Sequence, residues 1–201
     1  MDGKIKEIIK NIETELTHID KVSAEDIPGI DLYMDQVLSF LEKNLDNTRR
    51  HEDDKVVTKT MINNYAKNKL LPPPEKKKYS KDHILMLVFI YYFKNVLSLE
   101  DIRTLLTPIS EKYFHADSQP DLSALYSSIF DDNSDTLEHL KEDLNRAAEK
   151  SVESVKDLPQ DDRRFLQFFS MICSLTFDVY LRKHAIEKLI DTYLVENKTE
   201  L

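Results

Sequence analysis

The chain has 201 residues, a formal net charge of −9 and 41% hydrophobic residues, enough apolar material for one large domain or two small ones. Only 2 residues are glycine, whereas average usage would give roughly 14 in a chain of this length. Sheets need glycine at tight turns and bulges, so the composition argues against a sandwich, a barrel, a Rossmann fold and a glycine-rich phosphate loop.

Apolar residues recur at helical spacing along most of the chain. The first helix is predicted over 4–21, and Pro28-Gly29 indicates a turn before a second helix that contains Val37 and Leu41. The polar stretch 46–55 is predicted to be a loop. Further helices are predicted at 59–69, at 81–95, from Ser98 to a stop at Pro108, and at 121–130, 135–154 and 161–196.

Capping residues and prolines set the expected helix ends. Thr58, Ser80 and Ser98 are N-cap residues, and Asp101 stands at the capping-box position for Ser98. The prolines at 72–74 end the 59–69 helix, because the residue before a proline is pushed out of the α region. The first half of the 161–196 helix is apolar nearly all round, which indicates burial in a bundle or in an oligomer interface.

Positive charge is concentrated in residues 55–83. This segment holds eight lysines and two acidic residues, a net charge of +6, whereas the other 172 residues hold 20 bases and 35 acids, a net charge of −15. A compact basic segment in an acidic protein favours a polyanion-binding surface, although lysine runs are more often simply solvated.

The order of elements in this segment is typical of a winged helix-turn-helix, whose second helix enters the major groove of DNA. The amides of Asn63 and Asn64 can pair with adenine edges, and the residues at the helix start can hold a phosphate. The lysines after the prolines would straddle the flanking backbone. The candidate DNA-binding residues are Thr58, Lys59, Thr60, Asn63, Asn64, Lys67, Lys76, Lys77, Lys78 and Tyr79.

Four short segments carry a resemblance to a known family: VTKTMINNYA (57–66), KLLPP (69–73), YSKDHI (79–84) and LSLEDI (97–102). Their order and spacing resemble the DNA-binding domain of MerR-type regulators, over about a quarter of the chain. The resemblance implies a winged helix-turn-helix that binds double-stranded DNA. The whole chain is also similar to a bacterial family catalogued only as a domain of unknown function, which adds fold context and little mechanism.

The sequence departs from the MerR pattern at several positions. Asn63 stands where that family has a backbone-contacting arginine, and Lys69 replaces the glycine after the recognition helix. The loop 46–56 is longer and the wing is shorter than in the family, and the family's dimerisation coiled coil is not recognisable after Pro108. These departures favour an alternative, a helical adaptor that binds protein through a helix-turn-helix scaffold without binding DNA.

Other chemistry has little support in the sequence. The six histidines show no metal-binding spacing, and His51 with its neighbouring aspartates is better explained as a polar loop. The single cysteine, Cys173, excludes an internal disulfide and is expected to be a small core residue. We therefore expect no enzyme, no metal and no cofactor. Five aromatic residues could line an effector pocket, although their helical spacing more often indicates packing: Phe165, Phe168, Phe169, Phe177 and Tyr180.

The overall prediction is an all-α protein with a small wing, in three segments. Residues 1–30 form an N-terminal helix and turn, residues 31–108 a MerR-like winged helix-turn-helix, and residues 109–201 a helical dimerisation or effector domain. The expected function is a sequence-specific transcriptional regulator that binds double-stranded DNA as a homodimer, with an unidentified small-molecule effector as a further option. The first ten residues lack the pattern of a signal peptide, and the longest apolar run, 84–93, is too short to span a bilayer. A cytoplasmic protein with no membrane partner is expected.

Overall fold

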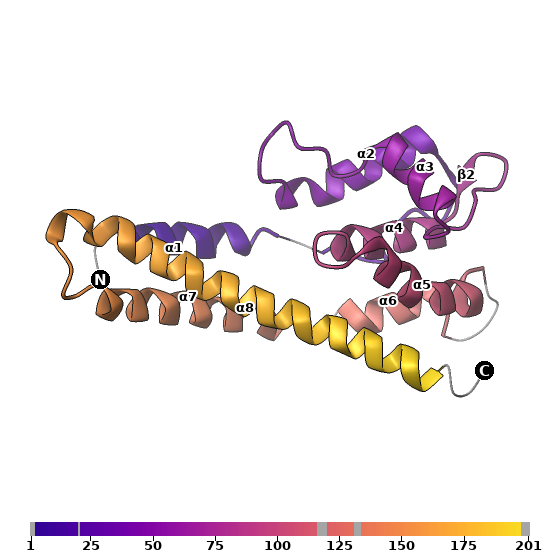
Figure 1. The fold of residues 1–201 in the computed structure, drawn as a ribbon. Helices are drawn as coiled ribbons and strands as arrows, with labels where there is room; N and C mark the ends of the chain where they lie inside the picture. The colour runs from indigo at the N-terminus through magenta and orange to yellow at the C-terminus, as the bar shows by residue number, and fades with distance from the viewer. Residues whose placement is uncertain (1–2, 20, 116–119, 131–133, 198–201) are drawn as a thin grey trace. The chain divides into compact units, whose positions relative to one another are not determined.

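The computed structural model describes residues 3–19, 21–115, 120–130 and 134–197, which are mostly helical with a small antiparallel sheet (Figure 1). The chain divides into two compact units, residues 20–132, here called the central unit, and residues 1–19 with 133–201, here called the α1/α7/α8 unit. These boundaries differ from the predicted ones at 30 and 108, because the N-terminal helix packs with helices from the end of the chain. Within the described ranges, no helix combines the length and the apolar character needed to cross a membrane.

The central unit contains most of the predicted elements, with ends shifted by a few residues. The sheet pairs residues on either side of α3 in the sequence, and only its second strand falls in the predicted wing. The elements are β1 (Leu32–Tyr33), α2 (Met34–Leu45), the 3₁₀ helix η1 (Asp46–Thr48), α3 (Lys59–Lys67), β2 (Lys78–Tyr79), α4 (Lys81–Phe93), α5 (Leu99–Tyr113) and α6 (Leu122–Phe130).

Helix α4 forms the core of the central unit. Its residues are apolar on every side, and the run from His83 to Tyr91 is buried without interruption. Helices α5 and α6 and strand β2 all pack against it. On the α6 side, the ring of Phe89 meets Tyr126 edge-on with centroids 5.3 Å apart, and the Tyr126 hydroxyl donates to the Val22 carbonyl at 2.7 Å. These contacts connect α4 and α6 to the segment that precedes β1.

Helix α5 begins as predicted and ends later than predicted. The Ser98 hydroxyl accepts from the Asp101 N–H at 3.1 Å and the Asp101 carboxylate accepts from the Ser98 N–H at 3.3 Å, which confirms the capping box. The prediction that the helix stops at Pro108 is wrong, since α5 continues to Tyr113. Buried Ile102 and Leu106 hold the helix against its neighbours, and this packing outweighs the one backbone hydrogen bond that proline cannot make.

The α1/α7/α8 unit contains α1 (Gly3–Leu16), α7 (Ser134–Ser154) and α8 (Gln160–Asn197). Helix α7 packs against both α1 and α8. A small core joins Ile5 and Ile9 of α1, Ala148 of α7 and Met171 of α8, with Phe168 against it. Helix α8 has 38 residues and is therefore about 57 Å long.

Most of α8 has little cover, and every side chain from Thr176 to Ile186 is exposed. Phe165 and Tyr180 are 69% and 61% exposed in the single chain, although the sequence indicates burial in a bundle or in an oligomer interface. Cys173 is also exposed, so its prediction as a small core residue is wrong. The physical reason is that α8 has few neighbours within its own unit, and a sequence pattern does not reveal how many neighbours a helix will have.

Candidate nucleic-acid interface

Helix α3 has one buried side and one polar side. The Thr58 hydroxyl accepts a hydrogen bond from the Met61 N–H at 3.2 Å and so caps the helix. Ile62 and Tyr65 are buried beneath it. At 100° per residue, the exposed polar residues fall within an arc of about 140°. The exposed residues of this polar face are Lys59, Thr60, Asn63, Asn64 and Lys67.

The chain leaves α3 through a Schellman motif. The Leu70 N–H donates to the Tyr65 carbonyl at 2.9 Å and the Lys69 N–H donates to the Ala66 carbonyl at 3.1 Å. Lys69 has a φ of 59°, in the left-handed region where glycine is favoured. Lys69, which stands where the MerR sequence pattern has glycine, therefore occupies a backbone position that favours glycine.

The segment predicted to be the wing, called the wing from here on, has a two-residue turn at its tip and supplies one strand of the short sheet. Leu32 pairs with Tyr79 and Tyr33 with Lys78, so β1 and β2 are antiparallel. The Lys78 N–H donates to the Glu75 carbonyl at 2.8 Å and closes the turn. The two residues inside it, Lys76 and Lys77, have φ values of 47° and 65° and are exposed. Positive φ at both central positions is the pattern of a type I′ turn, which normally selects Asn-Gly.

Lys78 and Tyr79 form strand β2, directly after the turn, and their side chains pack within the central unit. The Lys78 Nζ lies 5.4 Å from the centre of the Tyr33 ring, a cation–π contact between the two strands. Tyr79 is only 4% exposed, and burial raises the pKa of its hydroxyl. Tyr79 was predicted among the DNA-contacting residues, and its burial instead assigns it a supporting role.

A buried histidine joins the wing to α4, which sequence reasoning missed. The Ser80 N–H donates to Nδ1 of His83 at 3.0 Å, so the neutral ring carries its proton on Nε2 and donates to the Pro73 carbonyl at 3.4 Å. Burial lowers the pKa of His83, and nearby His115 lowers it further. The one available signal was the spacing Ser-x-x-His, which places the ring where a capping box has Glu or Gln.

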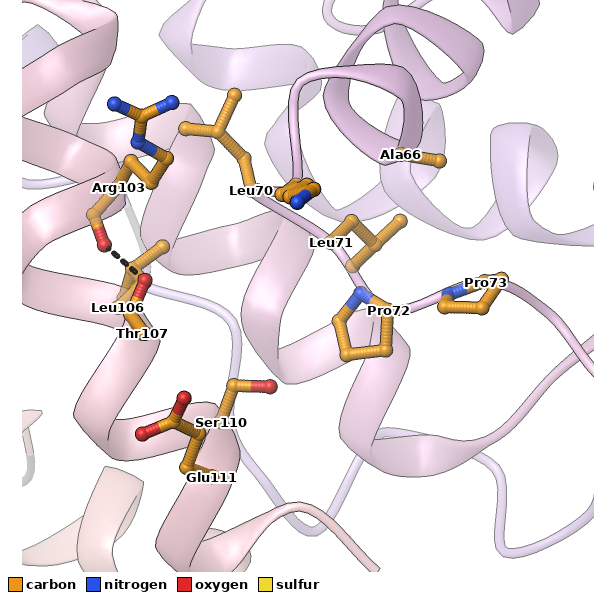
Figure 2. Close-up of a pocket in the computed structure, with 11 residues that line it drawn as sticks. Ala66, Leu70, Leu71, Pro72, Pro73, Arg103, Leu106, Thr107, Ser110 and Glu111 are labelled. Carbon is orange, nitrogen blue, oxygen red and sulfur yellow. Dashed lines mark hydrogen bonds between the residues drawn. The ribbon is translucent and has the colours of Figure 1, made fainter.

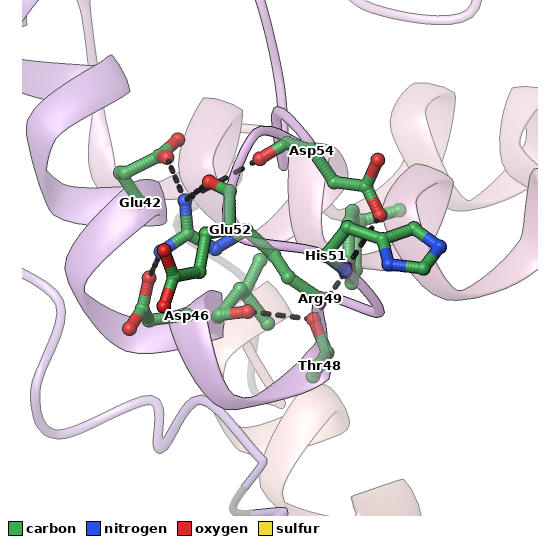
Figure 3. Close-up of polar contacts among 9 residues, drawn as sticks. Glu42, Asp46, Thr48, Arg49, His51, Glu52 and Asp54 are labelled. Carbon is green, nitrogen blue, oxygen red and sulfur yellow. Dashed lines mark hydrogen bonds and ion pairs between the residues drawn. The ribbon is translucent and has the colours of Figure 1, made fainter.

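The long loop before α3 is ordered by Arg49 (Figure 3). Its guanidinium contacts Glu42 of α2 at 3.1 Å and the backbone carbonyls of Glu52 and Asp54 at 3.2 and 3.4 Å. The same guanidinium also pairs with Asp46. One arginine thus ties α2, η1 and the following loop together, where the sequence indicated only a polar loop.

Helix α4 and its C-cap residue Lys94 anchor the two ends of this loop. The Thr48 hydroxyl hydrogen-bonds the Tyr91 hydroxyl, and the Lys94 Nζ donates to the Val56 carbonyl at 2.9 Å. Lys94 also lies 4.5 Å from the centre of the Tyr91 ring, and burial lowers the pKa of its ammonium group. Because Val56 lies two residues before the Thr58 N-cap, these contacts fix the start of α3.

A cavity of about 500 Å³ lies where the end of α3, the base of the wing and α5 meet (Figure 2). Its walls include Lys69, Pro73, Arg103 and Glu111. A second cavity, of about 390 Å³, lies between α7 and α8. Neither cavity is lined by the aromatic residues predicted to form an effector pocket. The binding of an effector therefore remains a prediction, and neither of these two cavities supports a role for those aromatic residues in it. Across the part of the chain that the structure describes, no group of three or more His, Cys, Asp or Glu side chains could hold a metal ion.

Comparison with known proteins gives a family and no activity. The family model described as "Domain of unknown function (DUF1836)" matches residues 22–129, from the segment before β1 to the last turn of α6. No curated protein and no solved structure matches the chain. Since the matched segment spans more than half of the 201 residues and contains the whole candidate interface, the chain belongs to the DUF1836 family.

Proposed function

We propose that the protein is a sequence-specific DNA-binding regulator in which α3 enters the major groove and the wing contacts the flanking phosphates. The turn at Lys76 and Lys77 is the observation that carries this proposal. A left-handed backbone costs roughly 1–2 kcal/mol for each residue other than glycine. Such strain is typical of functional sites, and here it holds two cationic side chains at the tip of the wing.

The polar face of α3 carries side chains that can contact base edges in the major groove and others that can contact the DNA phosphates. Asn63 and Asn64 lie in its middle, and an asparagine amide can donate to N7 and accept from N6 of adenine. Lys59 and Lys67 lie at its two ends, where they can reach phosphates on either side. The helix carries no acidic residue that would repel the DNA backbone. Its N-terminus is held in place by the contacts of Arg49 and Lys94.

The charge distribution predicts a strong dependence on salt. Four lysines on α3 and at the wing tip, if each neutralises one phosphate, give a slope of about −3.5 in log K against log salt for one copy. The acidic remainder of the chain, with its net charge of −15, opposes contact elsewhere on the molecule. We therefore expect the lysines to provide the salt-dependent part of the affinity, and Asn63 and Asn64 to provide the preference for particular bases.

The test is a fluorescence-anisotropy titration of a duplex that the protein prefers, repeated over a range of salt concentrations. The double variant Lys76→Ala, Lys77→Ala should reduce the salt slope by about 2, because each lost phosphate contact removes about 0.9. The matched control is Lys6→Ala, Lys10→Ala in α1, which also removes two exposed lysines and should leave the slope unchanged. Equal slopes for all three proteins would contradict the assignment of the wing.

A second candidate function is binding of an acidic protein through the same surface. Asn63 in place of an arginine, and a wing with only two exposed lysines at its tip, favour this alternative. It predicts weak binding to any duplex, abolished by physiological salt. A pull-down with the wild-type chain, compared with the wing-tip double variant, would then identify the partner.

A further inference from the structure

Helix α8 carries an exposed apolar face with no cover from its own unit. Phe165, Phe169, Ile172 and Tyr180 are between 55% and 69% exposed and, with Cys173 and Thr176, recur at spacings of three, four and seven residues. We call this set the outer face. The rings of Phe165 and Phe169 stack with centroids 6.1 Å apart. Met171 and Gln167, which are buried, lie on the other side of the helix.

The outer face approaches the area that a specific interface needs. Its four large side chains are 55–69% exposed and so offer about 110 Å² each, and with Cys173 and Thr176 the pairing of two such faces would bury roughly 1,000 Å² in total, close to the least area expected of a specific complex. Monomeric proteins rarely leave a contiguous apolar patch of this size in water. We propose that a second copy of this chain covers the outer face, with the two α8 helices packed antiparallel across a two-fold axis.

The sequence of the outer face is self-complementary about a point between Ile172 and Cys173. In an antiparallel pair centred there, Phe165 lies opposite Tyr180 of the second copy, and Ile172 lies opposite Cys173. Isologous two-fold interfaces require this kind of pattern, in which one patch serves both copies. Thr176 then lies opposite Phe169, between the centre and the Phe165–Tyr180 pair. The small threonine side chain leaves room for the Phe169 ring.

Charges at the ends of the outer face select the antiparallel direction. Asp162 and Lys183 are both exposed and lie at equal distances from the centre, on opposite sides of it. In the antiparallel pair, each Asp162 meets Lys183 of the second copy, at both ends of the interface. In a parallel pair Asp162 would meet Asp162 and Lys183 would meet Lys183, and such like-charge contacts disfavour that arrangement.

The dimer extends the proposed function, because it would present two copies of α3 to two half-sites of DNA. Only this use of the dimer rests on the proposed function. Self-association is measured without DNA, so the two proposals can fail separately. If the chain dimerises and does not bind DNA, the proposed dimer interface stands and the proposed function fails. If the chain binds DNA as a monomer, the proposed function stands and the dimer interface fails.

The first experiment is sedimentation equilibrium of the full chain over a wide concentration range. The variant Ile172→Glu places a charge at the centre of the interface from each copy and should weaken dimerisation by roughly 100-fold or more. The matched control is Leu189→Glu, which changes a residue that is 70% exposed on the opposite side of α8 and should leave the dimer intact. A wild-type chain that is monomeric at every concentration, or equal association of all three proteins, would overturn the proposal.

The second experiment uses the single cysteine to measure direction. Two copies of one residue approach each other only near the two-fold axis, so oxidation with copper–phenanthroline should link wild-type chains through Cys173. In a Cys173→Ser background, Asp162→Cys alone or Lys183→Cys alone should give no covalent dimer, because the equivalent positions are then about 30 Å apart. An equal mixture of these two variants should cross-link. Cross-linking of each variant alone would indicate a parallel pair and overturn the proposal.

Discussion

Helix α4 and the first half of α8 have a similar sequence character and opposite environments. Both are apolar nearly all round, yet α4 is buried from His83 to Tyr91, whereas α8 leaves Phe165, Ile172 and Tyr180 more than half exposed. The difference lies in the neighbours, because α4 is enclosed by α5, α6 and β2 while α8 packs mainly on α7. An apolar helix therefore indicates that cover is needed, and the rest of the chain determines whether the cover is intramolecular.

The largest predicted effect follows from this contrast. Leu85→Ala in α4 removes a side chain that is fully buried and should lower the free energy of unfolding by about 3 kcal/mol. Phe169→Ala in α8 removes a larger side chain that is 55% exposed and should cost less than about 1 kcal/mol in the monomer. Urea denaturation at low protein concentration measures both, and losses of equal size would contradict the contrast.

A second prediction separates strain from charge at the tip of the wing. Lys76→Asn with Lys77→Gly supplies the residues that a type I′ turn prefers and should raise the free energy of unfolding by roughly 1–2 kcal/mol, while DNA affinity falls. Lys76→Ala with Lys77→Ala is the matched control, because it removes the same charges and keeps a strained backbone. The control should lose affinity with no gain in stability. A gain in both proteins would show that charge repulsion, and not backbone strain, destabilises the turn.

A smaller effect is expected at the end of α3. Lys69→Gly relieves a single left-handed residue and should raise the free energy of unfolding by about 1 kcal/mol. Asn68→Gly changes the neighbouring residue, whose φ of −88° suits any side chain, and should give no gain. Thermal melts of the two variants decide the matter, and equal shifts would contradict the Schellman geometry.

The smallest effect is a pH dependence from His83. Its pKa is lowered from 6.5 by burial, so between the two values the unfolded chain binds more protons and the free energy of unfolding rises with pH. The stability that the neutral ring provides is complete above about pH 6.5 and is lost as the pH falls through the lowered pKa. His83→Gln retains the capping-box geometry without a titrating group. Denaturation from about pH 5 to pH 7 should show a steeper loss for the wild type than for this variant, and parallel curves would contradict the role of the ring.

Local sequence signals predicted the helices well and their environments poorly. The N-caps Thr58, Ser80 and Ser98 were read correctly because a cap depends on residues within one turn. The continuation of α5 past Pro108 and the exposure of Cys173 were not, because both depend on distant packing.

The candidate interface shows the same division. Helical spacing was sufficient to place the exposed polar residues of α3 on one face. The pairing of β1 with β2 joins residues 32–33 to residues 78–79 and leaves no local trace, so the burial of Tyr79 could not be foreseen. The left-handed turn at Lys76 and Lys77 also escaped prediction, since lysine is not a residue that such turns usually select.

We propose that the surface formed by α3 and the wing recognises a DNA sequence. The most direct measurement is a fluorescence-anisotropy titration of the wild-type chain against the duplex upstream of its own gene, beside a scrambled duplex, at two salt concentrations. We expect a preference for the upstream duplex that persists at the higher salt, because base contacts from Asn63 and Asn64 do not depend on counterion release. Weak and equal binding of both duplexes, abolished by salt, would contradict it.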